Sequence, residues 1–296
     1  MNKIDMVCKV AAGVPELNVR FAPSPMPVGV VQLETQAREY LLVGKGARGR
    51  TGILLVHSLS GTPKEMRLLA RSLNLQGYTV LTAKLAGHGG ALEHLVNTSW
   101  LDWLASVRRG ADLLASRVDR LVVGGISTGA VLALALAQER PLHVAGVLAL
   151  SPAFRHDGKG LPRYTRLAFL LPVLRVLGIG QGRVFSGQPP HAGLPGTPWE
   201  ALAEMRKLTA SVLRRMNLLR APCLVMHARH DDIASVSNAF EIVHRACHTN
   251  VSLQVLEDSR HMITAGRERR EVIARVAAFV NGIAEAPALQ GEALRA

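Results

Sequence analysis

The chain has 296 residues, of which 48% are hydrophobic and 19% are charged, a composition typical of a globular protein with a sizeable core. This composition excludes wholesale disorder, and the formal net charge of +13 does not by itself identify a partner. Because the arginines are spread along the chain and no recognisable nucleic-acid module accompanies them, we expect no nucleic-acid binding.

The chain contains only three cysteines, and they are too scattered for a disulfide framework or a zinc site. Lys3, Asp5 and Lys9 interrupt the apolar residues at the N-terminus, so we expect no secretion signal. The longest apolar stretch, residues 167–180, is broken by Pro172 and is shorter than the about 18 residues that a membrane span needs. We therefore expect a soluble cytoplasmic protein.

Short apolar runs rich in Val and Leu alternate with longer helix-like segments along the chain. This alternation predicts an α/β fold with a doubly wound, mostly parallel sheet. Most of the runs are continuously apolar, which is typical of strands that are buried on both faces. The predicted strands are residues 40–43, 52–57, 79–83, 121–124, 145–150, 223–227 and 251–256.

Helices are predicted between and after these strands. The first starts at Thr62, an N-cap candidate, with Pro63 at the first helical position and Glu65 able to complete a capping box. It ends near Gly77, just before the next strand. The other predicted helices are residues 100–115, 128–138, 235–246 and 268–281.

Residues 152–208 break this alternation, because clustered Pro and Gly surround short apolar pieces. This segment is predicted to be an insertion over the sheet. The core is then expected to comprise residues 37–151 and 209–283. Residues 1–36 are expected to form an N-terminal extension and residues 284–296 a C-terminal tail, both partly mobile.

The sequence Gly125-Ile126-Ser127-Thr128-Gly129 has the pattern G-x-S-x-G and lies between an apolar strand and an Ala- and Leu-rich helix. A nucleophile elbow has this context, because its glycines permit a sharp turn that projects the serine hydroxyl above the sheet. Ser127 is therefore the predicted nucleophile. The alternative is an ordinary tight turn whose serine caps the following helix.

A serine nucleophile needs a base and an acid that orients the base, and in this arrangement they follow the serine in the order acid, then histidine. Asp231 follows the predicted strand 223–227, and His261 follows the predicted strand 251–256. We therefore predict Asp231 as the acid and His261 as the base, with Asp232 and Asp258 as competing acids.

His227 and His230 lie beside Asp231 and could be interpreted with it as a metal cluster, but their spacing matches no common zinc pattern. We expect no metal and no organic cofactor. The oxyanion of an acyl-transfer intermediate would be bound by two backbone amides. These are predicted to be Thr128, at the start of its helix, and Leu59, in the loop after the strand 52–57, with Ser58 as an alternative to Leu59.

These residues resemble the monoacylglycerol lipase and carboxylesterase branch of the α/β-hydrolase superfamily, especially its small bacterial lidded members. The resemblance runs from about residue 38 to residue 280. It rests on Ile53-Leu54-Leu55-Val56-His57, Gly61-Thr62-Pro63, Gly77-Tyr78, Gly87-His88-Gly89, Trp100, Trp103, the Ser127 turn, the Asp231 turn and Ser259-Arg260-His261-Met262-Ile263-Thr264.

The resemblance implies a serine hydrolase that acts through an acyl-enzyme, with Ser127, Asp231 and His261 as its triad and the amides of Leu59 and Thr128 as its oxyanion hole. One departure concerns Ser58, because the family usually has glycine after the histidine of this loop. A serine there could place a hydroxyl near the acyl group, and it would alter the oxyanion loop.

The resemblance also implies that residues 152–208 form a cap over an acyl pocket. The candidate pocket residues, which would equally suit a small core within the cap, are Leu167, Phe169, Leu170, Leu171, Val173 and Leu174. The basic residues of this segment, Arg163 and Arg166 among them, suggest two hypotheses beside a solvated basic face. They attract an acidic substrate, or they hold the cap against an anionic lipid surface.

The predicted reaction is therefore hydrolysis of a carboxylic ester, with monoacylglycerol or a short- or medium-chain acyl ester as the small-molecule substrate. Thioesters, lactones, amides and acyl transfer to an alcohol would use the same residues, and they remain alternatives. An alternative of another class is a non-catalytic protein that binds a small apolar ligand on this fold. The oligomeric state is not predicted.

Overall fold

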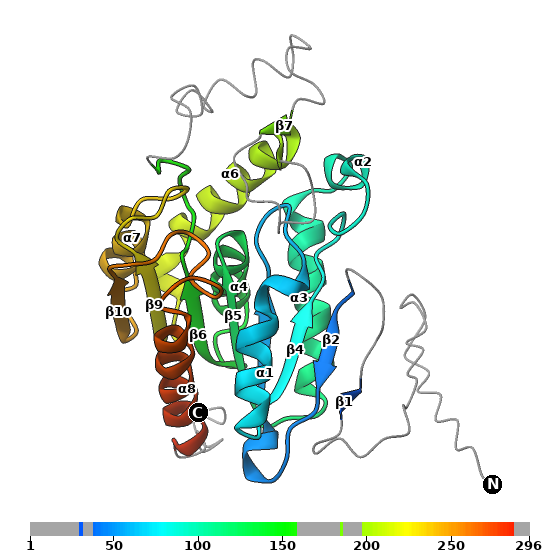
Figure 1. Cartoon of the computed structure of the whole chain (residues 1–296), viewed down its shortest axis with the longest axis vertical. Helices are drawn as coiled ribbons and strands as arrows, with labels where there is room; N and C mark the ends of the chain where they lie inside the picture. The colour runs from blue at the N-terminus through cyan, green and yellow to red at the C-terminus, as the bar shows by residue number, and fades with distance from the viewer. Residues whose placement is uncertain (1–29, 32–37, 159–183, 186–196, 287–296) are drawn as a thin grey trace, which may run out of the picture.

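The computed structural model describes residues 30–31, 38–158, 184–185 and 197–286 of the chain. Eight of its strands form one sheet (Figure 1). They are β1 (Val30–Val31), β2 (Tyr40–Leu42), β3 (Thr51–Val56), β4 (Thr79–Ala83), β5 (Arg120–Ile126), β6 (Val144–Leu150), β9 (Cys223–Ala228) and β10 (Val251–Leu256). The short strands β7 (Val184–Phe185) and β8 (Thr197–Pro198) form a separate antiparallel pair.

The large sheet has the order β1-β2-β4-β3-β5-β6-β9-β10. Strand β2 pairs antiparallel with β1 and with β4, and the other neighbouring strands are parallel. This arrangement confirms the predicted α/β class with a doubly wound, mostly parallel sheet. All of the predicted strands are present, whereas the two-residue strands β1, β7 and β8 are too short to produce a pattern in the sequence.

The helices cover both faces of this sheet. They are α1 (Arg67–Leu75), α2 (Leu92–Val96), α3 (Trp100–Ala115), α4 (Thr128–Glu139), α6 (Trp199–Arg214), α7 (Ser237–Arg245) and α8 (Arg269–Glu285). Three 3₁₀ turns in the described residues are η1 (Ala47–Arg50), η2 (Pro63–Met66) and η4 (Met216–Leu218). The helices predicted at residues 100–115 and 128–138 agree with α3 and α4 to within one residue.

Two apolar clusters lie on opposite faces of the sheet. In the first cluster, alternate residues of β3, β5 and β6 pack against α3, α4, α6 and α7. In the second cluster, the intervening residues of the same strands pack against α1 and α8. Helix α4 is buried from Thr128 to Gln138, which explains why its sequence is apolar all round. The helix that begins at the G-x-S-x-G turn is thus fixed on every side.

The prediction of one helix starting at Thr62 with a capping box at Glu65 is wrong in its details. The segment begins as the 3₁₀ turn η2 and becomes α-helical only at Arg67, and the Thr62 side chain makes no capping hydrogen bond. The Glu65 carboxylate turns instead toward the Ser58 amide and hydroxyl. A capping box does form at α3, where the Asp102 carboxylate accepts the Ser99 N–H.

Helix α6 crosses the predicted end of the insertion at residue 208. Its first half includes the buried Ala201 and Met205, and its second half includes the buried Leu208 and Val212. All four belong to the cluster that contains α3 and α4, so α6 packs against the core along its length. The acyl-pocket candidates at residues 167–174, together with Arg163 and Arg166, lie outside the described residues. No helix in the described part of the chain is long and apolar enough to cross a bilayer.

Candidate active site

Ser127 occupies the turn between β5 and α4. Strand β5 ends at Ile126 and α4 begins at Thr128, so the change of direction falls on Ser127 alone, whose φ of 57° and ψ of −118° lie outside the common regions. A residue other than glycine adopts a positive φ only where its surroundings hold it there, and such strain is concentrated at functional sites. The Ser127 N–H donates to the Leu150 carbonyl at the end of β6, which fixes the turn.

The glycines on either side of Ser127 are required by close packing. A Cβ atom at Gly129 would lie 2.2 Å from the Val56 carbonyl oxygen and 2.6 Å from that of His57. A Cβ atom at Gly125 would lie 2.5 Å from the carbonyl carbon of Gly129. All three distances are far shorter than any real contact, so side chains are excluded at both positions. The same packing brings the start of α4 against the end of β3, where the predicted oxyanion loop begins.

Asp231 follows β9 and receives hydrogen bonds on both carboxylate oxygens. The amides of Ile233 and Ala234 each donate to Oδ1 at 2.9 Å. On Oδ2, His261 Nδ1 lies at 2.8 Å and His227 Nε2 at 3.2 Å. The structure therefore brings the predicted acid and the predicted base together, although they are 30 residues apart in the sequence.

This bonding determines the ionisation state of Asp231. Burial on its own would raise the pKa of Asp231, but the hydrogen bonds and charges of His227 and His261 hold that pKa well below its ordinary value. Asp231 is therefore an anion at neutral pH and accepts the Nδ1–H of His261. The proton on Nδ1 leaves Nε2 of His261 as the basic nitrogen.

The competing acids make other contacts. The Asp232 carboxylate accepts the backbone N–H of His261 at 3.3 Å and does not reach the imidazole ring. Asp258 is exposed, and its side chain makes no hydrogen bond in the described part of the chain. No group of three or more His, Cys, Asp or Glu residues that could hold a metal ion occurs among the described residues, and His227 bonds instead to Asp231 and to the Ala234 carbonyl.

Ser127, Asp231 and His261 follow the carboxyl ends of β5, β9 and β10, which lie at one edge of the parallel strands. Their residues are 5%, 6% and 5% exposed, respectively. Ser127 Oγ makes no hydrogen bond with another described residue, His261 included, whereas the His261–Asp231 pair is closed. Catalytic hydrogen bonds are often long until substrate is bound, so this geometry is compatible with a triad.

The loop after β3 contains the predicted oxyanion donor Leu59. His57 anchors the start of this loop, because its Nδ1–H donates to the Ser58 carbonyl at 2.8 Å and its Nε2 accepts the Leu85 N–H at 3.2 Å. The Leu59 N–H has no partner in the described residues, and Thr128 is the first residue of α4, where an N–H has no partner within the helix. Both amides are therefore free to bind an oxyanion.

Ser58 is almost completely buried, and its hydroxyl donates to Glu65 Oε1 at 2.9 Å. The Ser58 hydroxyl is therefore held by Glu65. Its contact with an acyl group stays a prediction. Burial raises the pKa of Glu65 to about 7, although the hydrogen bonds from Ser58 and the charge of His261 oppose this effect. Sequence reasoning missed this role for Glu65, because its spacing from Thr62 suggested a local capping function.

His156 is a second residue that sequence reasoning missed. It follows β6 near the start of the predicted insertion, and burial lowers its pKa to about 4, in the same direction as the charge of His261. It is therefore uncharged at neutral pH, and it lies close enough to His261 and Asp231 to interact with them electrostatically. Asp157 fixes this segment, because it accepts hydrogen bonds from the Ser235 amide at 2.8 Å and from the Ser235 hydroxyl at 2.9 Å.

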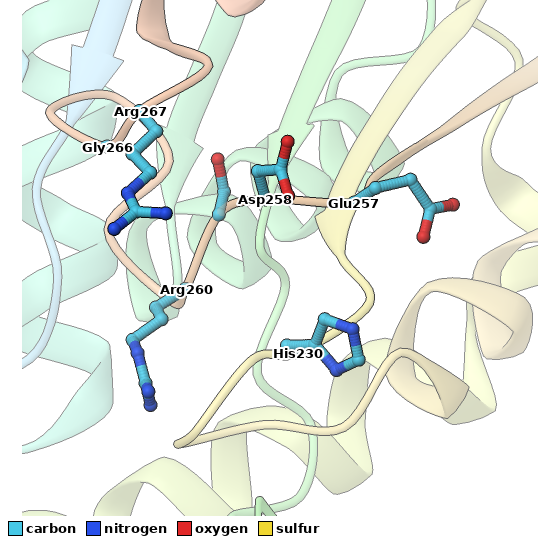
Figure 2. Close-up of a pocket in the computed structure, with 7 residues that line it drawn as sticks. His230, Glu257, Asp258, Arg260, Gly266 and Arg267 are labelled. Carbon is cyan, nitrogen blue, oxygen red and sulfur yellow. The ribbon is translucent and has the colours of Figure 1, made fainter.

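A pocket of about 460 Å³ lies beside the loops that carry Asp231 and His261. Figure 2 shows that charged and polar side chains surround it, with Arg260 and Arg267 on one side and His230 and Glu257 on the other. Neither Ser127 nor His261 lines this pocket. We therefore do not assign the acyl chain to this space.

The chain is similar to known hydrolases over most of its length. The family described as "Serine aminopeptidase, S33", also called Hydrolase_4, matches residues 48–268. The chain is 28% identical to the thermostable monoacylglycerol lipase of Bacillus sp. (strain H-257) over 239 residues, which is 78% of this chain and 90% of that protein. It is 26% identical to a carboxylesterase of Bacillus subtilis (strain 168) over 222 residues, covering 75% of this chain and 88% of the relative.

A solved structure from the study of the metagenome-derived lipolytic enzymes LipS and LipT has the same fold. It superposes with a TM-score of 0.70 at 25% sequence identity and covers 83% of this chain and 97% of its own. These similarities confirm the resemblance to monoacylglycerol lipases and carboxylesterases that the sequence motifs suggested. The chain therefore belongs to the Hydrolase_4 family of α/β-hydrolases.

Proposed function

We propose that this chain is a carboxylic ester hydrolase in which Ser127 is the nucleophile, His261 the general base and Asp231 the acid that orients it. The single observation that best supports the proposal is the His261–Asp231 pair, at 2.8 Å, on the same edge of the sheet as the strained Ser127 turn. A binding protein would not need an ionised, four-fold hydrogen-bonded aspartate behind a buried imidazole. The esterase and lipase relatives support the same chemistry.

In the proposed reaction, Ser127 Oγ attacks the carbonyl carbon of the ester while Nε2 of His261 takes the hydroxyl proton. The resulting oxyanion is bound by the amides of Leu59 and Thr128, and the second lies at the positive end of the α4 dipole. Collapse of this intermediate expels the alcohol, which receives the proton from His261. A water molecule then attacks the acyl-enzyme, His261 accepts its proton, and the carboxylic acid leaves as Ser127 is restored.

The proposed substrate is a monoacylglycerol or a short- or medium-chain acyl ester. It is supported by the named activities of the relatives and by the buried position of Ser127, which requires the acyl group to enter a desolvated site. We also propose that residues 152–208 form a cap over this site. The hydrogen bond between Ser60 Oγ and Thr197 Oγ1, at 2.9 Å, supports the cap because it joins the end of that segment to the oxyanion loop.

A cytoplasmic location is part of the same proposal. Its support is chemical, because Cys223 and Cys247 are free thiols and the second of them is exposed.

Cleavage of a peptide bond is the second candidate, because the matching family is described as a serine aminopeptidase. One panel separates the two candidates: p-nitrophenyl esters with acyl chains of 2 to about 12 carbons beside aminoacyl p-nitroanilides, with wild-type protein and Ser127→Ala. We expect ester hydrolysis that is lost in Ser127→Ala, with anilide hydrolysis at least about 100-fold slower. Faster anilide hydrolysis would favour the peptidase, and an inactive wild-type protein would favour an apolar-ligand binder.

A further inference from the structure

The Glu65 carboxylate holds both hydrogen-bond donors of Ser58. Its Oε2 accepts the Ser58 backbone N–H at 2.9 Å, and its Oε1 accepts the Ser58 hydroxyl at the same distance. Ser58 directly precedes Leu59, whose N–H is the first amide of the proposed oxyanion hole. Fixing the Ser58 N–H and side chain holds the residue on one side of the Leu59 amide. The Ser58 carbonyl, which shares a rigid peptide unit with the Leu59 N–H, accepts the Gly61 N–H at 3.1 Å, so the two contacts together limit the orientation of this amide.

Glu65 is itself held at two places, at its carboxylate and at its backbone carbonyl. A Cβ atom at Gly61 would lie 2.2 Å from Oε1 of Glu65, so the carboxylate occupies the inside of the turn that the Gly61 N–H closes onto the Ser58 carbonyl at 3.1 Å. The Glu65 carbonyl accepts the Thr264 hydroxyl at 3.2 Å. Thr264 belongs to the loop that carries His261, so Glu65 connects the oxyanion loop with the loop of the base.

We propose that Glu65 is a positioning residue that holds the Leu59 amide in place for the oxyanion by clamping both donors of Ser58. This inference rests on the proposed function of the site. It also gives Ser58 a purpose, because a glycine at this position would offer the carboxylate only one donor. Glu65 does not itself need to contact the substrate.

The clamp depends on the charge of Glu65. The ionised carboxylate accepts from both Ser58 donors. The protonated acid would donate its own hydrogen to the Ser58 hydroxyl, which would then no longer donate to Glu65. Among the charged groups of other elements, His261 faces the carboxylate from the loop after β10. His57, at the start of the oxyanion loop, stays uncharged because burial lowers its pKa well below the ordinary value. The clamp should therefore tighten as Glu65 ionises around neutral pH.

The experiment compares the wild-type chain with Glu65→Ala, Glu65→Gln and the matched control Lys64→Gln, an exposed neighbour on the same 3₁₀ turn. With p-nitrophenyl butyrate at pH 8, we expect Glu65→Ala to lower kcat by about 10- to 100-fold, which is less than complete loss of an oxyanion donor, with KM changed less than about threefold. Lys64→Gln should behave as wild type.

Glu65→Gln keeps the shape of the side chain. It therefore tests the role of the carboxylate even if Glu65→Ala fails to fold. The ratio of wild-type to Glu65→Gln kcat should rise between pH 5.5 and 8.5, because only the wild-type carboxylate ionises in that interval. Reaction with a fluorophosphonate separates the two levels of the proposal. If the wild-type protein is neither labelled nor active, the proposed function is overturned. If it is labelled and active but the ratio of wild-type to Glu65→Gln kcat stays constant across this pH range, only the role of Glu65 is overturned.

Discussion

Nδ1 of His261 lies 2.8 Å from Oδ2 of Asp231, and this pair joins the loops after the neighbouring parallel strands β9 and β10. The contact fixes both the orientation of the imidazole ring and its tautomer. An ionised carboxylate can only accept a hydrogen bond, so the nitrogen that faces it must carry the proton. Nε2 of His227, within β9, lies 3.2 Å from the same oxygen, and His227 and His261 together hold the pKa of Asp231 well below its ordinary value. The acid is thus held by its own strand and presented to a base from the next one.

Replacement of the acid tests this relationship. Asp231→Asn should lower kcat for an ester by about 10⁴-fold, because an amide that donates to Nδ1 would favour the wrong tautomer of His261. The measurement is kcat at pH 8 with circular dichroism to show an unchanged fold.

Asp258→Asn is the matched control, since Asp258 precedes His261 by three residues but is exposed and does not contact its ring. Its kcat should stay within about twofold of wild type. If Asp258→Asn were the more damaging change, the acid would have to be reassigned.

The packing of the Ser127 turn predicts that replacing a glycine by alanine changes stability very differently at this turn and at an exposed position of a helix. Gly129→Ala should destabilise the fold by about 3 kcal/mol or more, because its Cβ would meet two backbone carbonyls that cannot move independently. Gly282→Ala, in α8, has nothing within 4 Å of the added atom and should stabilise by about 0.5–1 kcal/mol. Urea unfolding of both variants checks this, and equal effects would contradict the packing described at the turn.

Glu65 should make stability depend on pH. Its pKa is raised to about 7 in the folded chain, so the folded state holds a proton that the unfolded state, with a pKa near 4.5, releases. The contribution of Glu65 to the free energy of unfolding therefore falls as pH rises from about 4.5 to 7, and it then levels off. Melting temperatures across this range should fall more steeply for wild type than for Glu65→Gln, and parallel curves would contradict the raised pKa.

Two buried threonines offer a paired test of the link between the proposed cap and the proposed oxyanion loop. Thr197 shares a hydrogen bond with Ser60, whereas the Thr209 hydroxyl is buried without a partner among the described residues. Thr197→Val should destabilise by about 1–3 kcal/mol, because it leaves the buried Ser60 hydroxyl unsatisfied. Thr209→Val should be neutral or slightly stabilising. The reverse order in thermal unfolding would contradict the hydrogen bond.

The strands of the sheet could be predicted from the sequence because β3, β5, β6 and β9 are buried on both faces and are therefore continuously apolar. The turn at Ser127 could be predicted because a sharp turn between a strand and a helix requires glycines on either side. Asp231 and Asp258 both follow predicted strands and both precede His261 in the chain, so only the folded contact with His261 distinguishes them.

Other features depend on contacts between distant residues and left no local pattern. Glu65 stands three residues after Thr62, which is the spacing of a capping box, and only the approach of Ser58 shows where its carboxylate binds. Helix α6 follows a segment rich in Pro and Gly, so its continuity with the core could not be predicted. His156 lies in an irregular segment whose position against His261 depends on the anchoring of Asp157.

The most direct test of the central claim is reaction of the native chain with a fluorophosphonate, followed by peptide mass mapping. The proposed triad predicts stoichiometric labelling at Ser127, none in Ser127→Ala, and labelling slowed by at least about 10²-fold in a folded His261→Ala variant. A folded, monodisperse wild-type protein that stays unlabelled at pH 8, or that is labelled at a different serine, would contradict it.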